Sequence, residues 1–202
     1  MNIESTKNYD SVKFTSDDLS TLTINEAHFV KCIFKSVDMR EINTSRCVFD
    51  GCDFTGAKMN GSSHKVSAFA GCKFNKASLF SAGFDGCKMT GSNFMDADLK
   101  GLTVSGGDWS FVNFRHQDLR SMDFSNVKLQ ETDFYGCNLE KSVFTGADMK
   151  RAVLADSKLY GVDIRGAVID GIDFTKVNVN GLKIDIMQAV VIAQSKGAIV
   201  GG

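Results

Sequence analysis

Every fifth residue from Phe14 to Ile184 is apolar, and the register does not shift along this stretch. The only polar residues in the series are Thr44 and His64. A strict five-residue period fits neither an α-helix, with a period of about 3.6 residues, nor a flat two-sided strand, with a period of about two. The pattern instead indicates a chain that winds around an axis and turns a corner in every unit.

The position two residues before each of these central residues also accepts only a narrow range of residue types. It holds mostly small or apolar side chains, including all the cysteines, whereas the other three positions of each unit carry nearly all the charge. Most glycines lie two residues after a central residue, where a turn is needed. We expect the cysteines to be small core residues rather than disulfides or metal ligands. They are Cys32, Cys47, Cys52, Cys72, Cys87 and Cys137.

Residues twenty apart share the same chemical character, which indicates that four units close one coil. One wall is aromatic: Phe14, Phe34, Phe54, Phe74, Phe94, Phe114 and Phe134. The next wall is aliphatic: Leu19, Met39, Met59, Leu79, Leu99, Leu119 and Leu139. The sequence therefore predicts an all-β fold, a quadrilateral parallel β-helix of about nine coils that rise by ~4.8 Å each. The apolar side chains fill its shaft.

The period divides the chain into three parts. We expect residues 1–11 to form an N-terminal tail or cap, residues 12–184 the β-helix, and residues 185–202 a C-terminal helix and dimerisation segment. Asp185 is a suitable N-cap, Gln188 stands at the capping-box position and Gly197 is the expected C-cap.

The predicted C-terminal helix is apolar on nearly all sides. One side can cover the open end of the shaft, and the remainder predicts a second buried contact, most simply a two-fold dimer. The alternative is a helix that acts as a cap alone. The expected interface residues are Ile186, Met187, Val190, Val191 and Ile199.

Charge and motifs exclude several functions. The chain carries 23 basic and 24 acidic residues, so no bulk charge favours direct nucleic-acid or membrane binding. Its first residues lack the pattern of a signal peptide, and we expect a cytoplasmic protein. No catalytic, metal-binding or cofactor motif is present, so we expect neither an enzyme nor a bound metal or cofactor.

Two local features interrupt the regular pattern. Thr44 and His64 lie one coil apart on the same wall, which predicts either a buried hydrogen-bonded pair or a local distortion of the wall. The pair Gly106-Gly107 precedes Trp109 and predicts a bulged or irregular corner. Residues 102–112 are therefore the best candidate for a local exterior feature.

The repeat resembles the pentapeptide repeat family, whose consensus is A(D/N)LXX. The matching segments are Ala97-Asp98-Leu99, Cys137-Asn138-Leu139 and Ala147-Asp148-Met149. The resemblance implies that the quadrilateral β-helix is right-handed. It implies little about function, because this fold serves many roles.

The C-terminal part resembles a narrower group, the MfpA and Qnr quinolone-resistance proteins. The similarity lies in residues 155–168, in Gly181-Leu182-Lys183-Ile184-Asp185 with Gln188-Ala189, and in residues 197–202. It implies a cytoplasmic homodimer, joined at its C-termini, that binds DNA gyrase, and often topoisomerase IV, in place of DNA. Such a protein modulates or protects the enzyme and gives fluoroquinolone resistance or toxin immunity. The unbroken register fits the loop-free MfpA-like type.

DNA mimicry requires an ordered run of negative charge. Four acidic residues on nearby outward columns are the candidates to face gyrase: Asp96, Asp98, Asp118 and Asp156. The alternative is an ordinary solvated surface, in keeping with a formal net charge of −1. A structural or scaffolding pentapeptide repeat protein with a different protein partner is then the alternative function.

Overall fold

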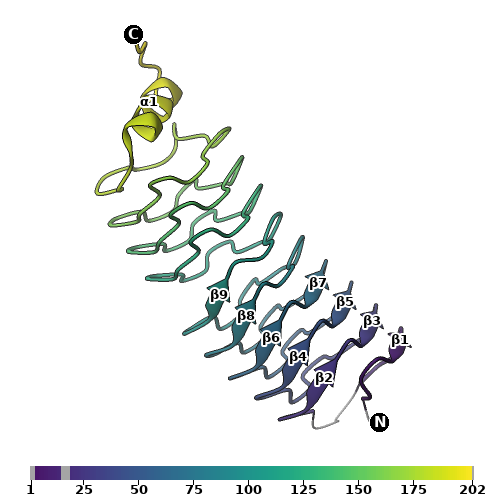
Figure 1. Cartoon of the computed structure of the whole chain (residues 1–202). Coiled ribbons are helices and arrows are strands. Elements are labelled where there is room, and N and C mark those ends of the chain that lie inside the picture. Colours follow the sequence, from purple (N-terminus) through teal and green to yellow (C-terminus); the bar gives the residue numbers. More distant parts are fainter. Residues whose placement is uncertain (1–2, 15–18, 202) are drawn as a thin grey trace.

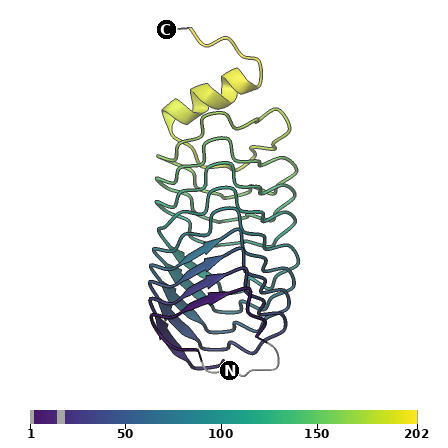
Figure 2. The same ribbon diagram turned by 90° about the vertical axis from the view of Figure 1, so that its right-hand side faces the viewer.

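The computed structural model describes residues 3–14 and 19–201 as a rod of stacked coils with one helix at its C-terminal end (Figure 1). Strands β1 (Asn8–Asp10), β3 (His28–Val30), β5 (Val48–Asp50) and β7 (Ala68–Ala70) form one sheet. Strands β2 (Thr23–Asn25), β4 (Asn43–Ser45), β6 (Ser63–Lys65), β8 (Gly83–Asp85) and β9 (Thr103–Ser105) form the second. The two ends of the chain lie at opposite ends of the rod (Figure 2).

All strand pairs are parallel and join residues twenty positions apart, such as Phe29 with Phe49. Isolated parallel bridges continue the other walls with the same spacing, for example from Lys13 to Ile33 and from Asp38 to Lys58. Four separate ladders with one twenty-residue register make four walls. The predicted quadrilateral parallel β-helix is therefore confirmed.

The shaft is packed by the central residues of the repeat. Phe14 and Phe34 stack at 4.7 Å between ring centroids, and Phe54 and Phe74 stack at 5.0 Å. Rings on adjacent walls meet edge to face, as Phe29 and Phe34 do at 5.6 Å. Because each buried phenylalanine removes a large apolar area from water and also gains ring–ring contact, these columns supply much of the stability of the rod.

The corners explain the placement of glycine. Residues two positions after a centre adopt a left-handed backbone, with φ of +60° at Gly51 and +56° at Ser36. The corner recurs every five residues, so it favours glycine, although many corners use a non-glycine residue at some conformational cost.

The β-ladder extends one unit further toward the N-terminus than the predicted boundary at residue 12. Strand β1 pairs with β3, and the ring of Tyr9 stacks on Phe29 at 4.9 Å. Tyr9 is buried and stands five residues before Phe14, so it occupies a central position of the repeat.

Helix α1 (Ile186–Ser195) begins with the predicted capping box, in which Asp185 accepts a hydrogen bond from the Gln188 backbone N–H and the Gln188 side chain accepts one from Asp185. The helix ends one residue earlier than expected, with Lys196 as the C-cap and Gly197 following it at φ +89°. Backbone hydrogen bonds from Gly197 to Gln194 and from Ala198 to Ala193 complete a Schellman motif.

The two polar central residues, Thr44 and His64, form a buried hydrogen-bonded network with neighbouring serines. Thr44 Oγ1 lies 2.7 Å from His64 Nδ1, and Ser62 Oγ lies 3.0 Å from His64 Nε2. The prediction of a buried hydrogen-bonded pair is confirmed. Complete burial lowers the pKa of His64 to about 3, so the imidazole is neutral at physiological pH.

The cysteines are buried and free, as the repeat predicts. Cys87 Sγ donates to the His64 backbone carbonyl at 3.3 Å, and Cys137 Sγ donates to that of Phe114 at 2.9 Å. Burial raises the pKa of Cys87 to about 11 and that of Cys137 to about 12, which keeps both thiols protonated and unreactive.

Candidate functional site: an opening in the wall of the solenoid

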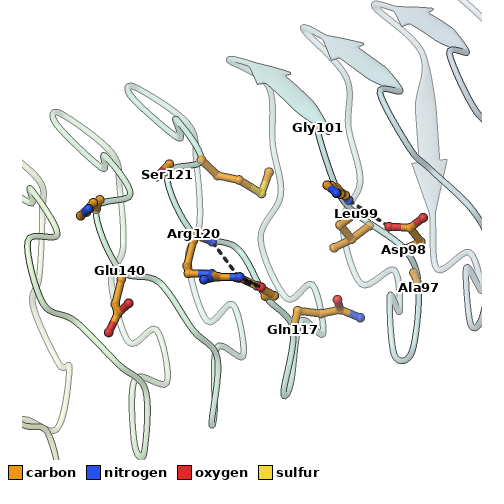
Figure 3. Close-up of a pocket in the computed structure, with 12 residues that line it drawn as sticks. Ala97, Asp98, Leu99, Gly101, Gln117, Arg120, Ser121 and Glu140 are labelled. Carbon is orange, nitrogen blue, oxygen red and sulfur yellow. Dashed lines mark hydrogen bonds and ion pairs between the residues drawn. The ribbon is translucent and has the colours of Figure 1, made fainter.

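Two of the four candidate acidic residues lie together. Asp98 and Asp118 line one cavity of about 710 Å³ on the aliphatic wall, whereas Asp96 and Asp156 do not line it. Figure 3 shows Asp98 on one side of this cavity and Arg120 on the other. Lys100, Glu140 and Lys141 complete its charged lining.

Bases accompany many of the outward acids. Arg120 Nη2 lies 2.6 Å from Asp118 Oδ2, and this contact is the main cause that lowers the pKa of the Asp118 carboxyl. The same arrangement recurs with Arg40 beside Asp38 and with Arg165 beside Asp163. The surface therefore carries a patchwork of charges rather than a continuous acidic stripe.

The other two candidates lie on a corner column. Asp156 lies beside Tyr135 and raises the pKa of that phenol through a side-chain hydrogen bond and its charge. The guanidinium of Arg115 stacks over the Tyr135 ring at 4.4 Å, and His116 meets that ring edge to face at 5.4 Å. Asp96 precedes His116 by twenty residues on the same column and is exposed.

The cavity lies where the backbone ladder is interrupted. Asp98 pairs with Ser78 below it, and Asp118 pairs with Asn138 above it, but no bridge joins Asp98 to Asp118 among these described residues. The equivalent of the hydrogen bond from Leu79 N–H to the Asp98 carbonyl would run from Leu99 to Asp118, and it is missing from this described stretch. We call the gap between residues 97–104 and 117–123 the inter-coil cleft.

The interruption spans two walls and the corner between them. Within the described ladders, the hydrogen bond to the neighbouring coil is also missing at the backbone N–H groups of Gly101, Val104 and Asp123. The equivalent N–H groups on closed coils, those of Ser81, Phe84 and Val143, make this hydrogen bond. The opposite side stays closed, because the backbone N–H of Trp109 donates to the Lys128 carbonyl at 2.8 Å and the backbone N–H of Phe114 donates to the Asp133 carbonyl at 2.9 Å. The coils are therefore parted on one side only. A smaller cavity of about 230 Å³, lined by Leu159 and Asn178 among others, lies near the C-terminal end.

Trp109 provides a physical cause for the opening. It is fully buried, and it stands two units after Leu99, on the opposite wall. Its ring lies 5.9 Å from that of Phe94 and 6.0 Å from that of Phe114. Ring spacing in the Phe column widens from 4.8 Å between Phe74 and Phe94 to 5.2 Å between Phe94 and Phe114, and to 5.7 Å one coil further, between Phe114 and Phe134. The largest side chain of the shaft acts as a wedge in a densely packed column.

Gly107 lies beside the wedge. It adopts a φ of +87°, and a Cβ at this position would lie 2.1 Å from the Cys87 carbonyl oxygen. Sequence reasoning identified residues 102–112 as irregular, but it did not identify the cleft, because half of the cleft is formed by the next coil. The nearest signal in the sequence was the succession of Gly106, Gly107 and Trp109.

The C-terminal end presents the second candidate surface. Ile186 is 84% exposed, Met187 75% and Ile199 100%, whereas Val190 and Val191 are half-buried. Ile192 and Gln188 are buried, and the Gln188 side chain donates to the Ile164 and Ala167 carbonyls at 2.6 and 2.8 Å. One face of α1 therefore caps the shaft, and the predicted interface residues divide between the cap and the free surface.

No helix among the described residues has the length and apolarity needed to cross a membrane. Within the same residues, no group of three or more histidine, cysteine, aspartate or glutamate side chains is arranged to hold a metal ion.

Stacked four-walled coils with a five-residue period define the class of protein. A profile described as "Pentapeptide repeat region" matches residues 77–147, and one described as "Pentapeptide repeats (8 copies)" matches residues 32–63 and 132–171. The chain is a pentapeptide repeat protein. No curated protein sequence matches it significantly.

Solved structures share the fold over nearly the whole rod. A trypsin-treated variant of QnrB1, described as a plasmid-mediated fluoroquinolone resistance protein, has a TM-score of 0.72 at 18% identity, covering 98% of this chain and 99% of that one. Full-length QnrB1 gives a TM-score of 0.72 at 17% identity, covering 96% and 99%. At this level of identity the likeness establishes the fold alone.

Proposed function

We propose that this protein is a homodimer that binds DNA gyrase, and in the same way topoisomerase IV, at the surface where these enzymes bind DNA. It thereby modulates or protects the enzyme in the cytoplasm and gives fluoroquinolone resistance or immunity to a gyrase-directed toxin. In this role it is a binding protein and not an enzyme.

The C-terminal end is the observation that carries the proposal. Its sequence resembles the quinolone-resistance group, and Ile186 and Met187 lie exposed on α1 at the end of the rod. Apolar surface at the end of a repeat protein favours association, and a two-fold contact is the simplest closed arrangement. Two rods joined end to end would present a long, narrow surface comparable to a stretch of duplex. The likeness in fold to QnrB1 is consistent with this arrangement.

The charge pattern restricts which residues can imitate DNA phosphates. Asp118 is partly neutralised by Arg120, whereas Asp96, Asp98 and Asp156 are exposed and have no ion-pair partner within the described part of the chain. We infer that these three side chains supply most of the negative charge offered to gyrase, because an unpaired carboxylate keeps its attraction for a basic DNA-binding surface.

A scaffolding protein with a different protein partner is the second candidate. The alternation of charge along the ladders favours it, for example Lys88, Asp108, Lys128 and Asp148 on successive coils. Such a pattern suits a self-complementary surface better than a DNA mimic.

A supercoiling assay with purified gyrase separates the two. We expect the protein to inhibit supercoiling or to preserve it in the presence of a quinolone, and the triple variant Asp96→Asn, Asp98→Asn, Asp156→Asn should lose this effect. If the protein neither binds gyrase nor alters supercoiling with or without drug, the scaffolding function is favoured.

A second triple variant provides the matched control for charge. Asp53→Asn, Asp108→Asn, Asp148→Asn removes the same number of carboxylates, but from positions that pair with lysines across the ladders. It should keep most of the effect on gyrase, because those carboxylates are already balanced by neighbouring bases.

A further inference from the structure

The two sides of the inter-coil cleft oppose like charges. Asp98 and Asp118 occupy equivalent positions on successive coils, and Lys100 and Arg120 follow each of them by two residues. If the ladder were closed here as it is elsewhere, acid would face acid and base would face base. Directly opposed like charges destabilise a strand pair.

The closed ladders avoid this conflict. Among the described residues, every paired position joins opposite charges, a charged and a neutral residue, or two neutral residues. Examples of opposite charges are Asp38 with Lys58, Asp53 with Lys73 and Lys65 with Asp85. The cleft is therefore the place in the described rod where the outward charges disfavour closure, in addition to the wedge formed by Trp109.

The cleft also leaves the backbone and the core incompletely covered. Leu99, Gly101 and Asp123 each have a backbone N–H directed to the neighbouring coil without an inter-coil hydrogen bond in this described region. Val104 and Met122 are only half-buried, although their equivalents on closed coils, Phe84 and Ala82, are fully buried. Unpaired sheet edges of this kind pair readily with an added strand.

We propose that the inter-coil cleft binds an extended peptide segment of a partner protein, which lies between the two coils as an additional parallel strand. The segment has the pattern small–basic–apolar–acidic. Its basic side chain lies outside between Asp98 and Asp118, and its acidic side chain lies outside between Lys100 and Arg120. Its apolar side chain packs against Leu99 and Met122, which line the cavity. Hydrogen bonds to both edges provide affinity, and the two charges provide register and direction. This proposal does not rest on the proposed interaction with gyrase, although both would use the Asp98 carboxylate.

The charges on the lower edge are available for such a partner. The Asp98 carboxylate accepts a hydrogen bond only from the Lys100 backbone N–H, at 3.2 Å, among the contacts of the described residues. The Lys100 ammonium takes part in no ion pair of the described chain. On the upper edge, Asp118 and Arg120 pair with each other and would exchange part of this contact for the peptide. The occupant therefore satisfies charges that the protein leaves unpaired.

Two peptides of identical composition test the proposal on the full-length protein. The probe is acetyl-Gly-Ala-Lys-Leu-Glu-Gly-Ala-Thr-Val-Gly-amide, and the control exchanges its lysine and glutamate. Amide NMR spectra are recorded during titration. We expect the probe to cause saturable shifts of the Leu99, Gly101 and Asp123 amides and to slow their exchange by about tenfold or more, as new hydrogen bonds form. We expect at least a tenfold weaker effect from the control peptide.

Reversal of the protein's own charges provides the decisive comparison. The quadruple variant Asp98→Lys, Lys100→Glu, Asp118→Lys, Arg120→Glu changes four exposed side chains, keeps like charges opposed across the cleft and leaves the core intact. It should prefer the control peptide over the probe. The proposal is overturned if neither peptide binds, if both bind equally well, if the preference does not invert, or if the three amides are as protected in the free protein as those of Leu79 and Val143.

Discussion

Asp98 and Asp118 lie one coil apart in the same column, yet their walls are not hydrogen-bonded, whereas Ser78 and Asp98 are paired one coil earlier. Like charge on the outside and a bulky indole on the opposite wall act in the same direction. Neither effect alone needs to be large. A pair of like charges facing each other destabilises the ladder by up to about 1 kcal/mol, and a single backbone hydrogen bond stabilises it by only about 0.5–1.5 kcal/mol.

Removal of one charge should draw the edges of the cleft together. We expect Asp98→Asn to slow amide exchange at Leu99 and to raise the free energy of unfolding by about 0.2–1 kcal/mol. Asp108→Asn is the matched control, because Asp108 lies between Lys88 and Lys128 on closed ladders, and it should lower stability by a similar amount. Equal effects of the two substitutions on stability would contradict charge repulsion at the cleft.

Trp109 should be replaceable at little cost. Its Nε1–H is buried without a hydrogen-bond partner. Trp109→Phe removes this buried N–H, whose missing hydrogen bond costs about 1–3 kcal/mol, and places a smaller ring in the shaft. Both changes offset the loss of apolar contact. We expect a change in stability below about 1.5 kcal/mol, measured by urea denaturation, whereas Phe69→Ala on a closed coil of the same wall should cost about 3–5 kcal/mol. A loss of that size for Trp109→Phe would exclude a wedge.

Gly107 should tolerate no side chain. Gly107→Ala places a Cβ against the Cys87 backbone, where no flexible atom can give way, in addition to the strain of a positive φ. Gly91→Ala is the control, because its φ of +71° imposes the same strain while nothing lies within 4 Å of the added Cβ. Thermal unfolding should show a modest loss for Gly91→Ala, about 1 kcal/mol, and a clearly larger one for Gly107→Ala. Similar losses would mean that the backbone contact is not rigid.

His64 should make the rod sensitive to acid. Its folded pKa of about 3 lies below the ordinary value of 6.5, so the unfolded chain binds a proton first as the pH falls. Its contribution to stability is complete above pH 6.5 and is lost between pH 6.5 and about 3, at about 1.4 kcal/mol per pH unit. Urea denaturation at about pH 7.5 and about pH 5 should therefore differ by about 2 kcal/mol more in the native protein than in His64→Leu. An identical pH dependence in both proteins would refute this role.

The proposed dimer can be separated from the cap. Met187→Asp alters an exposed side chain of α1 and should convert the dimer to a monomer in light scattering without a large loss of stability. Ile192→Asp alters the buried face instead and should destabilise the last coils. A dimer that survives Met187→Asp would place the interface elsewhere.

Much of the fold could be predicted because the repeat encodes it residue by residue. The five-residue register predicted the walls, the buried cysteines and the Thr44–His64 contact, and local capping residues predicted α1. The cleft could not be predicted in the same way. It results from the combined size of Trp109 and the position of charges on two coils, and a strict register gives no sign that hydrogen bonds are missing. The partition of the C-terminal apolar residues between cap and surface also depends on how the helix lies on the shaft.

The most direct test of the central claim is competition for gyrase between this protein and linear duplex DNA. The account predicts that the labelled protein binds gyrase and that duplex DNA displaces it in a concentration-dependent manner, with weaker binding by the Asp96→Asn, Asp98→Asn, Asp156→Asn variant. Binding that DNA does not displace, or no binding at all, would contradict it.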